Sequence, residues 1–530
     1  MKKIISFKET KKVVGIITLF LFCCLTSMAQ NPSWAKKASQ AVFTLKTFNN
    51  DGSLIGSSNG FFIGNDGEAL SCFAPFKGAQ RAVVIDAQGK EWPVECLLGA
   101  NDMYDVAKFK VSVKKPVTLA LSSSATNGAV AWLLPYSAKK SPDCQRGSVT
   151  SSEKFQGDYS YYTLAMQASE QHSGCPVLDE NGQVLGLLQP SSVTSSSASA
   201  YAVSAVFAND LCISGLSMND PAFRSTHITI ALPDQHDEAL LTLLMAASAD
   251  EVQYQDVIDR FIQKFPQSAD GYIYRARNEV AKGDFAAANN DIRQALKVGQ
   301  QKDDTHFQVA QMIYQKEIYQ ADQPYPDWNL DLALKESREA YRINPQPVYR
   351  QQQAQILYAQ QKYDEAGSIY EELAKGPLRN ADTFYAAAQC KLQQDNKKEA
   401  LILLDSAVSM FTRPYIKTAA PYLHARAQLS MEFRRFQQAI NDMQDLVALE
   451  PTDVDLWAEK ASFELRLNLF DQAFESATQC ISLAPDVSDG YLMAGIAQCA
   501  KGDKKQGLQN LDKAKELGNS QAQKFIDKYK

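Results

Sequence analysis

The sequence predicts a two-part chain in which a β-rich region precedes an all-α region. Between residues 41 and 212, short apolar runs alternate with turn clusters, a pattern typical of an antiparallel barrel or sandwich. Beyond residue 213 the apolar residues recur at helical spacing, and small residues return at a fixed interval. A chain of 530 residues is also too long for one hydrophobic core, so at least two domains are expected.

The first 29 residues are expected to be a signal peptide. Five lysines precede a 13-residue apolar run, Val13 to Leu25, and Ser27-Met28-Ala29 offers a small-x-small cleavage pattern. The run is shorter than the ~20 residues that span a bilayer. We therefore expect cleavage near Gln30 and export to the periplasm, cell envelope or exterior, with no transmembrane segment left. An uncleaved anchor and a lipoprotein at Cys23 or Cys24 stay open as alternatives.

Charge and cysteine spacing exclude several classes of function. Without the five lysines and one glutamate of residues 1–29, the 54 basic and 60 acidic residues become 49 and 59, a formal charge of −10. Such a chain repels phosphate backbones, so no nucleic acid partner is expected. The eight cysteines that remain contain no Cys-x-x-Cys pair and match no zinc ligand set. No metal and no cofactor is predicted.

The β-rich region is expected to contain short strands of about four to six residues each. Turn clusters such as Asn49-Asn50-Asp51-Gly52 and Asn65-Asp66-Gly67 separate them. The strands are predicted near residues 42–45, 60–63, 83–85, 106–111, 130–134, 182–188 and 200–206.

The helical region carries a repeat of 34 residues. Its small residues Ala366, Ala400, Ala439, Ala473 and Gly507 are separated by 34, 39, 34 and 34 positions. Three prolines, Pro345, Pro451 and Pro485, each follow a small residue by twelve positions, namely Ala333, Ala439 and Ala473. This pattern resembles the tetratricopeptide repeat, in which small residues allow close helix packing. The resemblance covers residues 238–518 in about eight units, after a linker at 213–237 and before a cap helix at 519–530.

The resemblance implies a concave groove that binds a protein or peptide ligand. Counting back from each small residue, the groove positions hold Gln351, Gln355, Tyr358, Tyr385, Gln389, His424 and Gln428. Three glutamines occupy the same place in successive units, and glutamine offers both a donor and an acceptor to an extended backbone. The alternative is that glutamine is simply a favourable solvated helix residue.

Three segments of the β-rich region resemble trypsin-like serine proteases of the high-temperature-requirement (Deg) type. They are Ser58-Asn59-Gly60-Phe61-Phe62-Ile63, Tyr104-Asp105-Val106-Ala107 and His172-Ser173-Gly174-Cys175-Pro176-Val177. They follow the family's order over residues 33–212. The resemblance implies a trypsin-like double β-barrel, with Ser173 at the nucleophile position and Asp105 at the orienting carboxylate.

The base of the implied triad is missing. Its place falls on Ala74, and residues 1–171 contain no histidine. A serine hydroxyl is a weak nucleophile without a base, and loss of the base costs about 10⁶-fold in turnover. His172 adjoins Ser173, but neighbouring residues of an extended chain point to opposite sides. We therefore expect a degenerate, inactive protease-like domain.

The oxyanion loop also departs from the family pattern. Its residues are Gln171, His172 and Gly174, and Gln171 stands where the family has a glycine that orients the amide donors. The resemblance also brings Cys72 and Cys175 to the same cleft, where a disulfide is expected after export. Cys72 lies two residues before Ala74, and Cys175 lies two residues after Ser173.

These observations predict an exported protein-interaction protein with an inactive protease-like domain and a repeat scaffold. One alternative is an active endopeptidase whose base is a lysine, such as Lys77 or Lys108, or a histidine from the repeats, with the repeats recruiting substrate. Another alternative makes the barrel an inert spacer and the repeats the whole function.

Overall fold

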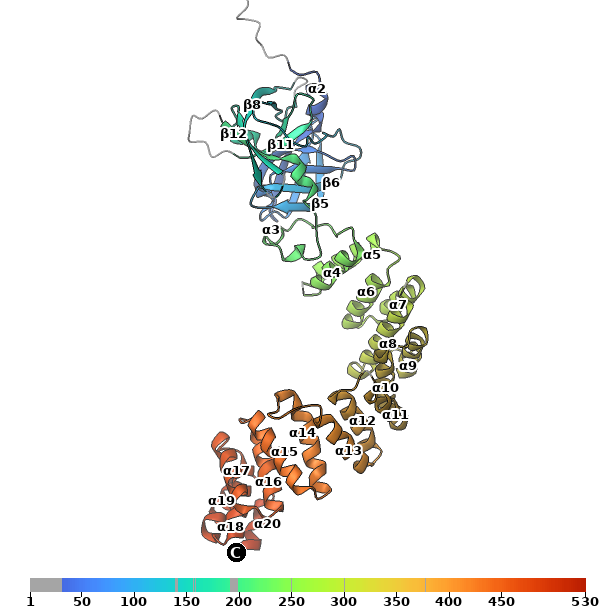
Figure 1. Cartoon of the computed structure of the whole chain (residues 1–530), viewed down its shortest axis with the longest axis vertical. Helices are drawn as coiled ribbons and strands as arrows, with labels where there is room; N and C mark the ends of the chain where they lie inside the picture. Colours follow the sequence, from blue (N-terminus) through green and yellow to red (C-terminus); the bar gives the residue numbers. More distant parts are fainter. Residues whose placement is uncertain are drawn as a thin grey trace, which may run out of the picture. The chain divides into compact units, whose positions relative to one another are not determined.

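The computed structural model describes residues 31–138, 142–155, 157, 159–190, 199–248, 250–299, 301–376 and 378–530. The expected signal peptide, residues 1–29, lies outside the described residues. Across the described part, none of the helices combines the length and apolarity needed to cross a membrane. The chain divides into two compact units, Met1–Pro266 and Gln267–Lys530 (Figure 1).

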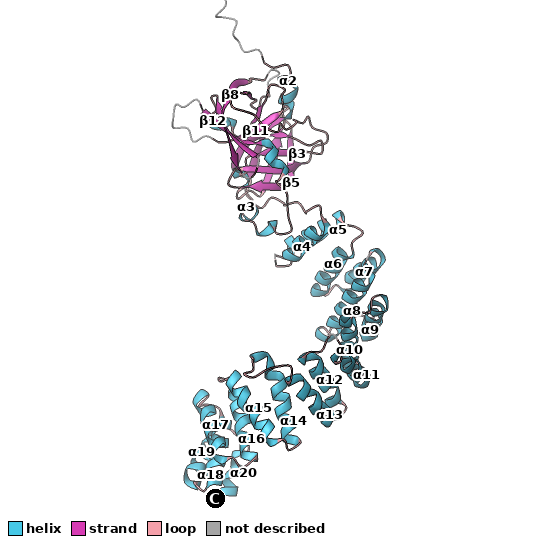
Figure 2. Ribbon diagram, in the orientation of Figure 1, coloured by secondary structure: helices cyan, strands magenta, loops and turns pink. Residues whose placement is uncertain are grey.

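The first unit contains two closed six-stranded antiparallel barrels (Figure 2). The first barrel has the strand order β1-β2-β3-β6-β5-β4, and the second has the order β10-β11-β12-β9-β8-β7. The strands are β1 (Val42–Phe48), β2 (Leu54–Phe62), β3 (Glu68–Ser71), β4 (Arg81–Ile85), β5 (Glu91–Asn101), β6 (Val106–Val111), β7 (Val130–Leu133), β8 (Gln145–Phe155), β9 (Tyr159–Ala165), β10 (Pro176–Leu178), β11 (Val184–Leu188) and β12 (Ser199–Ser204). The predicted double barrel is confirmed.

Each barrel buries its own apolar core. Phe43, Phe76 and Phe109 are fully buried in the first barrel, and the ring of Phe109 meets the other two edge-on, with centroids 5.2 to 6.1 Å apart. In the second barrel, Tyr162 and Leu164 of β9 pack with residues of β7, β11 and β12. Closure leaves no strand edge open, so the loops between strands carry the polar groups that can act.

Residues 213–237, expected to form a linker, instead pack against the first barrel. Leu97 of β5 donates a backbone hydrogen bond to Thr229 O at 2.8 Å and accepts one from Ala231 N at 2.9 Å. Phe223 and Ile228 join the barrel core. Pro221 and Pro233 suggested a linker, but Pro221 starts the short helix α3 (Pro221–Arg224) and the residues between the two prolines are apolar enough to bury.

The rest of the described chain is helical. Its helices are α4 (His236–Ala246), α5 (Glu251–Lys264), α6 (Ala269–Lys282), α7 (Phe285–Val298), α8 (Lys302–Tyr319), α9 (Leu330–Ile343), α10 (Pro347–Ala359), α11 (Tyr363–Ala374), α12 (Ala381–Gln393), α13 (Lys397–Val408), α14 (Ala420–Glu432), α15 (Phe436–Leu449), α16 (Val454–Arg466), α17 (Phe470–Leu483), α18 (Ser488–Lys501), α19 (Lys504–Glu516) and α20 (Ala522–Tyr529). Helices α4 and α5 belong to the first unit, and α6 to α20 form the second.

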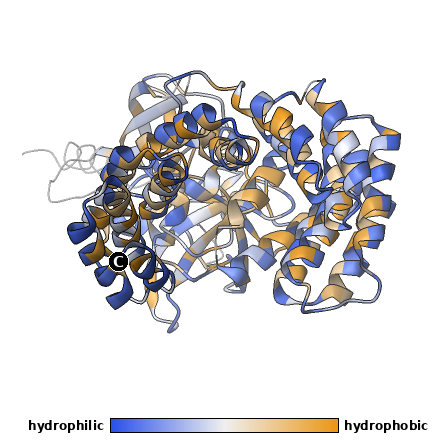
Figure 3. Ribbon diagram, turned by 90° about the horizontal axis from the view of Figure 1, so that it is seen from below, coloured by the Kyte–Doolittle hydropathy of each residue, from blue (hydrophilic) through white to orange (hydrophobic). Residues whose placement is uncertain are grey.

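The repeat pattern maps onto helix pairs. Ala439 and Ala473 are fully buried on the second helices of their pairs, where a larger side chain would separate the helices. Pro345, Pro451 and Pro485 each lie two residues beyond the end of a second helix, a position that proline favours after a helix. The helices have one apolar and one polar face, as Figure 3 shows by hydropathy.

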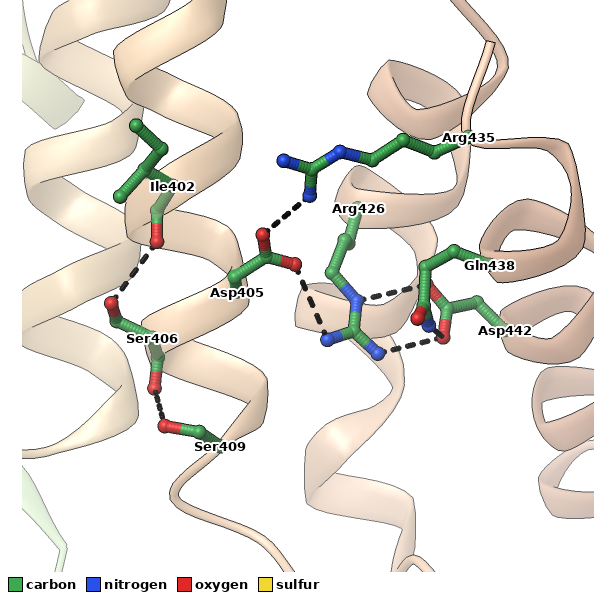
Figure 4. A network of polar contacts seen from close by, with 8 residues as sticks. All are labelled: Ile402, Asp405, Ser406, Ser409, Arg426, Arg435, Gln438 and Asp442. Carbon is green, nitrogen blue, oxygen red and sulfur yellow. Dashed lines mark hydrogen bonds and ion pairs between the residues drawn. The ribbon is translucent and has the colours of Figure 1, made fainter. Parts of the chain in front are cut away.

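The repeats also bury charged pairs (Figure 4). Arg426 of α14 donates two hydrogen bonds to Asp442 of α15, at 2.8 and 2.9 Å, and Asp442 is fully buried. Gln438 donates to the same carboxylate at 2.8 Å, while Asp405 lies 3.6 Å from Arg426. The bidentate geometry pairs the two charged groups directly with each other.

The same pairing recurs in an earlier repeat. Arg275 of α6 binds Asp291 of α7 through two hydrogen bonds of 2.6 and 2.8 Å, again with a spacing of 16 residues. A charged pair between the two helices of a repeat is therefore a recurrent structural element of this solenoid.

Candidate active site

In the first barrel, Asp105 lies against Ala74, the position at which the protease resemblance places a base. Asp105 is the last residue of the loop before β6 and has a left-handed backbone conformation, with φ of 47°. Its carboxylate accepts a hydrogen bond of 2.6 Å from the backbone N–H of Ala74. Ala74 is exposed and begins the short 3-10 helix Ala74–Phe76. The structure thus brings together Asp105 and Ala74, but the methyl group of Ala74 offers no proton acceptor.

The second barrel supplies Ser173 on the loop before β10. Ser173 is buried, and its hydroxyl has no hydrogen-bond partner among the described residues. Gly174 follows with φ of 80°, and a Cβ there would collide with the carbonyl of Asn59. A glycine is therefore required at 174, both for its backbone angles and for this close approach.

The backbone N–H of Ser173 is engaged within its own loop. Residues Glu170–His172 form a turn of 3-10 helix, and Ser173 N donates to Glu170 O at 3.0 Å. In serine proteases the N–H of the nucleophile is one of the two donors that bind the oxyanion. In this conformation that donor is already satisfied, so it cannot stabilise a tetrahedral intermediate without a rearrangement of the loop.

Asn59 of β2 fixes the loop that carries Ser173 by hydrogen bonds. This role was not predicted from the sequence. Its side-chain amide donates to Gln171 O at 2.7 Å and to Ser173 O at 3.2 Å, and its backbone N–H donates to Ser173 O at 2.8 Å. Asn59 is buried. These bonds join the first barrel to the serine loop of the second. The resembling segment contained Asn59, but nothing in its sequence indicates that it binds two carbonyls.

The histidines considered as bases bind other groups. His172 Nδ1 accepts from Ser169 N at 3.1 Å, and burial lowers the pKa of His172. His306 lies 2.5 Å from Glu336, and His424 lies 2.5 Å from Glu459.

The two lysines near the matched segments also lie away from the serine. Lys77 forms an ion pair of 2.5 Å with Asp102. Lys108 lies on β6 between the buried Ala107 and Phe109, so it points out of the barrel. Neither lysine nor any of the histidines contacts the Ser173 hydroxyl, which has no hydrogen-bond partner in the described structure.

Cys72 and Cys175 are both buried free thiols at this site. Burial raises the pKa of Cys72 well above its usual range, with the charge of Asp105, a hydrogen bond to it and the charge of Cys175 adding to the shift. Burial raises the pKa of Cys175 to about 12. The two thiols are close enough to influence each other. The structure describes the reduced pair, and the expected disulfide stays a prediction.

The groove residues predicted from the repeats lie on three successive first helices. Gln351, Gln355 and Tyr358 lie on α10, Tyr385 and Gln389 on α12, and His424 and Gln428 on α14. Gln355 and Gln428 are exposed and the others are half-buried. Gln428 donates a hydrogen bond to Glu459 at 3.1 Å. Glu459 also forms a hydrogen bond with His424, which raises the pKa of His424, so both of these groove side chains already have a partner within the protein.

Two closed barrels that place a serine loop beside an aspartate define a trypsin-like peptidase fold, and stacked helix pairs with buried alanines define a repeat solenoid. Comparison with known families agrees. The family described as "Trypsin-like peptidase domain" matches residues 58–187, and a tetratricopeptide repeat family matches residues 352–415. The chain thus carries a trypsin-like peptidase domain followed by tetratricopeptide repeats.

Individual relatives cover only parts of the chain. The Rv3671c protease from M. tuberculosis H37Rv, solved in an inactive form as a Ser-to-Ala mutant, is 19% identical, with a TM-score of 0.29 over 34% of this chain and 89% of its own. The HtrA-type protease AlgW with a tripeptide is 21% identical, with a TM-score of 0.29 over 34% of this chain and 62% of its own.

A yeast protein resembles part of this chain. Small glutamine-rich tetratricopeptide repeat-containing protein 2 of Saccharomyces cerevisiae is 26% identical over 106 residues, which are 20% of this chain and 31% of that protein. The match therefore spans about a third of the yeast relative.

Proposed function

We propose that this protein is exported and acts without catalysis, with its protease-like barrels as a binding or scaffolding domain and its repeats as the site for a protein or peptide ligand. The observation that carries the proposal is the Ser173 hydroxyl, which is buried and has no partner within the described structure. A nucleophilic serine needs a base within hydrogen-bond reach. Ala74 stands at the position where the protease family has its base, and the backbone N–H of Ala74 donates a hydrogen bond to the Asp105 carboxylate.

The loop geometry supports the same proposal independently. The Ser173 N–H is bound to Glu170 O, and Asn59 holds the carbonyls of Gln171 and Ser173. A base supplied by the repeats or by a ligand would still meet a loop whose oxyanion donor is occupied. Two separate features therefore oppose peptide hydrolysis.

Casein turnover by the purified full chain tests the proposal, with Ser173→Ala as the matched control. We expect the wild-type protein and the variant to give the same background rate. Turnover that disappears in Ser173→Ala would establish an active endopeptidase and overturn the proposal.

An Ala74→His variant separates the two features. Because the loop still occupies the Ser173 N–H, we expect this variant to remain close to background. Full turnover in Ala74→His would show that the missing base is the only obstacle and that the loop opens readily.

Export is tested by N-terminal sequencing of the native protein. We expect a mature N-terminus at or near Gln30, because a basic lead, an apolar run of 13 residues and a Ser-x-Ala site precede it. An N-terminus at Met1 or Lys2 would contradict the proposed export.

A further inference from the structure

A long connection interrupts the repeat pattern between helices α8 and α9 (Figure 1). Ten residues, 320–329, join these two helices, whereas two residues join α6 to α7 and three join α10 to α11. The long connection folds back onto α7, because the indole N–H of Trp328 donates to Asn289 Oδ1 at 3.1 Å and Trp328 is buried. It therefore adds a packed wall to one repeat unit.

This wall borders a cavity of about 330 Å³, a volume in the range of small-molecule sites. Eight of its ten lining residues come from α7, from α9 and from the long connection. The other two, Val309 and Ile313, are buried residues of α8. Helices α7 and α9 are the second helices of their units, so the cavity is separate from the groove positions predicted on the first helices α10, α12 and α14.

Most of the cavity lining is apolar. Five aliphatic side chains contribute to it: Ile292, Val309 and Ile313 are buried, and Leu296 and Leu332 are half-buried. The indole ring of the long connection is the sixth apolar group. The apolar body of a ligand that entered the cavity would therefore be removed from water, which favours binding.

Two carboxylates of the lining have an oxygen to spare. Glu336 of α9 is only 8% exposed, and its Oε2 lies 2.5 Å from His306 Nδ1. Its other oxygen, Oε1, has no hydrogen-bond partner among the described residues. Asp327 accepts from Asn289 and Arg293 through Oδ2, at 3.1 and 3.4 Å, and its Oδ1 likewise has no partner in the part of the chain that the structure describes.

The donors of the lining are already used. The Asn289 amide donates to Asp327 and to the Tyr325 hydroxyl, and the Trp328 indole donates to Asn289. Arg293 pairs with Asp327, and its side chain is 67% exposed, so it lies at the rim of the cavity. The described residues of the lining therefore offer spare acceptors inside apolar walls, and their one guanidinium is in contact with solvent.

The complementary ligand carries N–H donors on an apolar body. A buried carboxylate oxygen without a donor is costly, and a charged donor makes the strongest hydrogen bond to it. We propose that this cavity binds a small organic ammonium ion, with its apolar body against Trp328 and its N–H donors on the free oxygen of Glu336. The proposed site is independent of the barrels and of the predicted groove, so the proposed function does not depend on it.

Isothermal titration calorimetry with the purified full chain tests the inference. The three probes share a phenyl ring on a short alkyl chain: phenethylamine carries an ammonium group, phenethyl alcohol a hydroxyl and hydrocinnamate a carboxylate. We expect saturable binding of the amine, at least about tenfold tighter than that of the alcohol, which corresponds to about 1.4 kcal/mol, and no binding of the carboxylate. Equal affinity for the amine and the alcohol, preference for the carboxylate, or no saturable binding of the amine would overturn the inference.

Glu336→Gln tests the proposed anchor of the ammonium group. The amide keeps an oxygen that can accept from His306 but has no charge, so we expect the affinity for phenethylamine to fall at least about tenfold. Glu339→Gln on the same helix is the matched control, because Glu339 pairs with Arg342 and does not line the cavity. The inference fails if Glu336→Gln binds the amine as tightly as the Glu339→Gln control does.

Leu332→Trp locates the site by filling the cavity. Leu332 is a half-buried residue of the lining, and a larger side chain there should abolish binding of both the amine and the alcohol. Ile318→Trp, at an exposed position of α8 outside the lining, is the control and should bind the amine like the wild-type chain. Thermal unfolding of both variants verifies that they fold. Wild-type affinity for the amine in folded Leu332→Trp would place the ammonium ion elsewhere and overturn the inference.

Discussion

The Ser173 loop of the barrels and the Arg426–Asp442 pair of the repeats bury polar side chains in opposite ways. In the barrels, the Ser173 hydroxyl is buried without a partner, beside two buried thiols. In the repeats, Arg426 and Asp442 are also buried, but each satisfies the other with two hydrogen bonds. The Ser173 hydroxyl is therefore buried at a cost to stability, whereas the Arg426–Asp442 pair holds α14 and α15 together.

This difference indicates what each region retains. Under the proposal that catalysis is lost, the unpartnered buried hydroxyl is the remainder of a nucleophile site. A satisfied ion pair at equivalent positions of two repeats, Arg275–Asp291 and Arg426–Asp442, is a packing element instead. Substitutions at the two places should consequently change stability in opposite directions.

The largest effect is expected for Asp442→Ala. The substitution removes both hydrogen bonds that Arg426 makes to Asp442 and leaves the buried guanidinium only the carboxylate of Asp405, 3.6 Å away. Removing one partner of a buried ion pair typically costs about 3–5 kcal/mol. Hydrogen exchange of the amides of α14 and α15 should accelerate correspondingly. Asp445→Ala on the same helix is the control, because Asp445 pairs with the exposed Arg413 and such pairs contribute about 0–1 kcal/mol. Equal effects of the two substitutions would contradict the structural role of the buried pair.

The cysteine pair gives the next largest effect. A Cys72–Cys175 disulfide is expected to stabilise the first unit by about 2–4 kcal/mol. Because burial raises the pKa of both thiols, few thiolates exist at neutral pH, and oxidation should be slow and faster at alkaline pH. Peptide mapping of the oxidised protein measures the bond. A Cα separation above about 7 Å in an experimental structure would contradict it.

Ser173→Ala should stabilise the barrels. Removing a buried hydroxyl without a partner relieves a desolvation penalty, with an expected gain of about 1 kcal/mol. Chemical unfolding of the first unit is the measurement, and Ser71→Ala is the control. The Ser71 hydroxyl donates to Asn59 O, so its loss should destabilise. A destabilised Ser173→Ala would mean that the hydroxyl has a partner.

A smaller, pH-dependent effect is expected for Glu279→Gln in the repeats. Burial and the charge of Asp291 raise the pKa of Glu279 to about 7. The folded state thus favours the protonated form of Glu279. The stability that this protonated side chain contributes is lost as the pH rises from about 4.5 to about 7. The variant should gain about 0.5–1 kcal/mol at pH 8, allowing for solvent screening, and little at pH 5.

Thermal unfolding at the two pH values measures this gain. Glu475→Gln on α17, an exposed glutamate, is the control and should show no pH-dependent difference. A gain that is the same at both pH values would contradict the raised pKa of Glu279.

Much of the fold followed from periodicity and turn chemistry. Strand β6 was predicted at residues 106–111, and these are its bounds in the structure. Strands β3, β5, β8, β9 and β10 were not predicted. Strand β8 (Gln145–Phe155), for example, contains only two large apolar side chains, Val149 and Phe155, so no apolar run marks it in the sequence. The 39-residue repeat gap is explained by the loop and the short 3-10 helix Lys417–Ala419 between α13 and α14.

The site was less accessible from the sequence. The expected absence of a base at Ala74 depends on residue identity alone, so one sequence was enough to predict it. The bond from Ser173 N to Glu170 O depends on backbone angles, and the contacts of Asn59 join residues more than 110 positions apart. Long-range contacts between backbone carbonyls and one amide leave no periodic signal.

Labelling of Ser173 with a fluorophosphonate probe tests the central claim most directly. The probe bonds only to a serine that a neighbouring base activates. For the purified full chain, we expect labelling no greater than that of Ser173→Ala under the same conditions. Labelling of the wild-type chain that is lost in Ser173→Ala would show an activated nucleophile and contradict the account of a protease fold without catalysis.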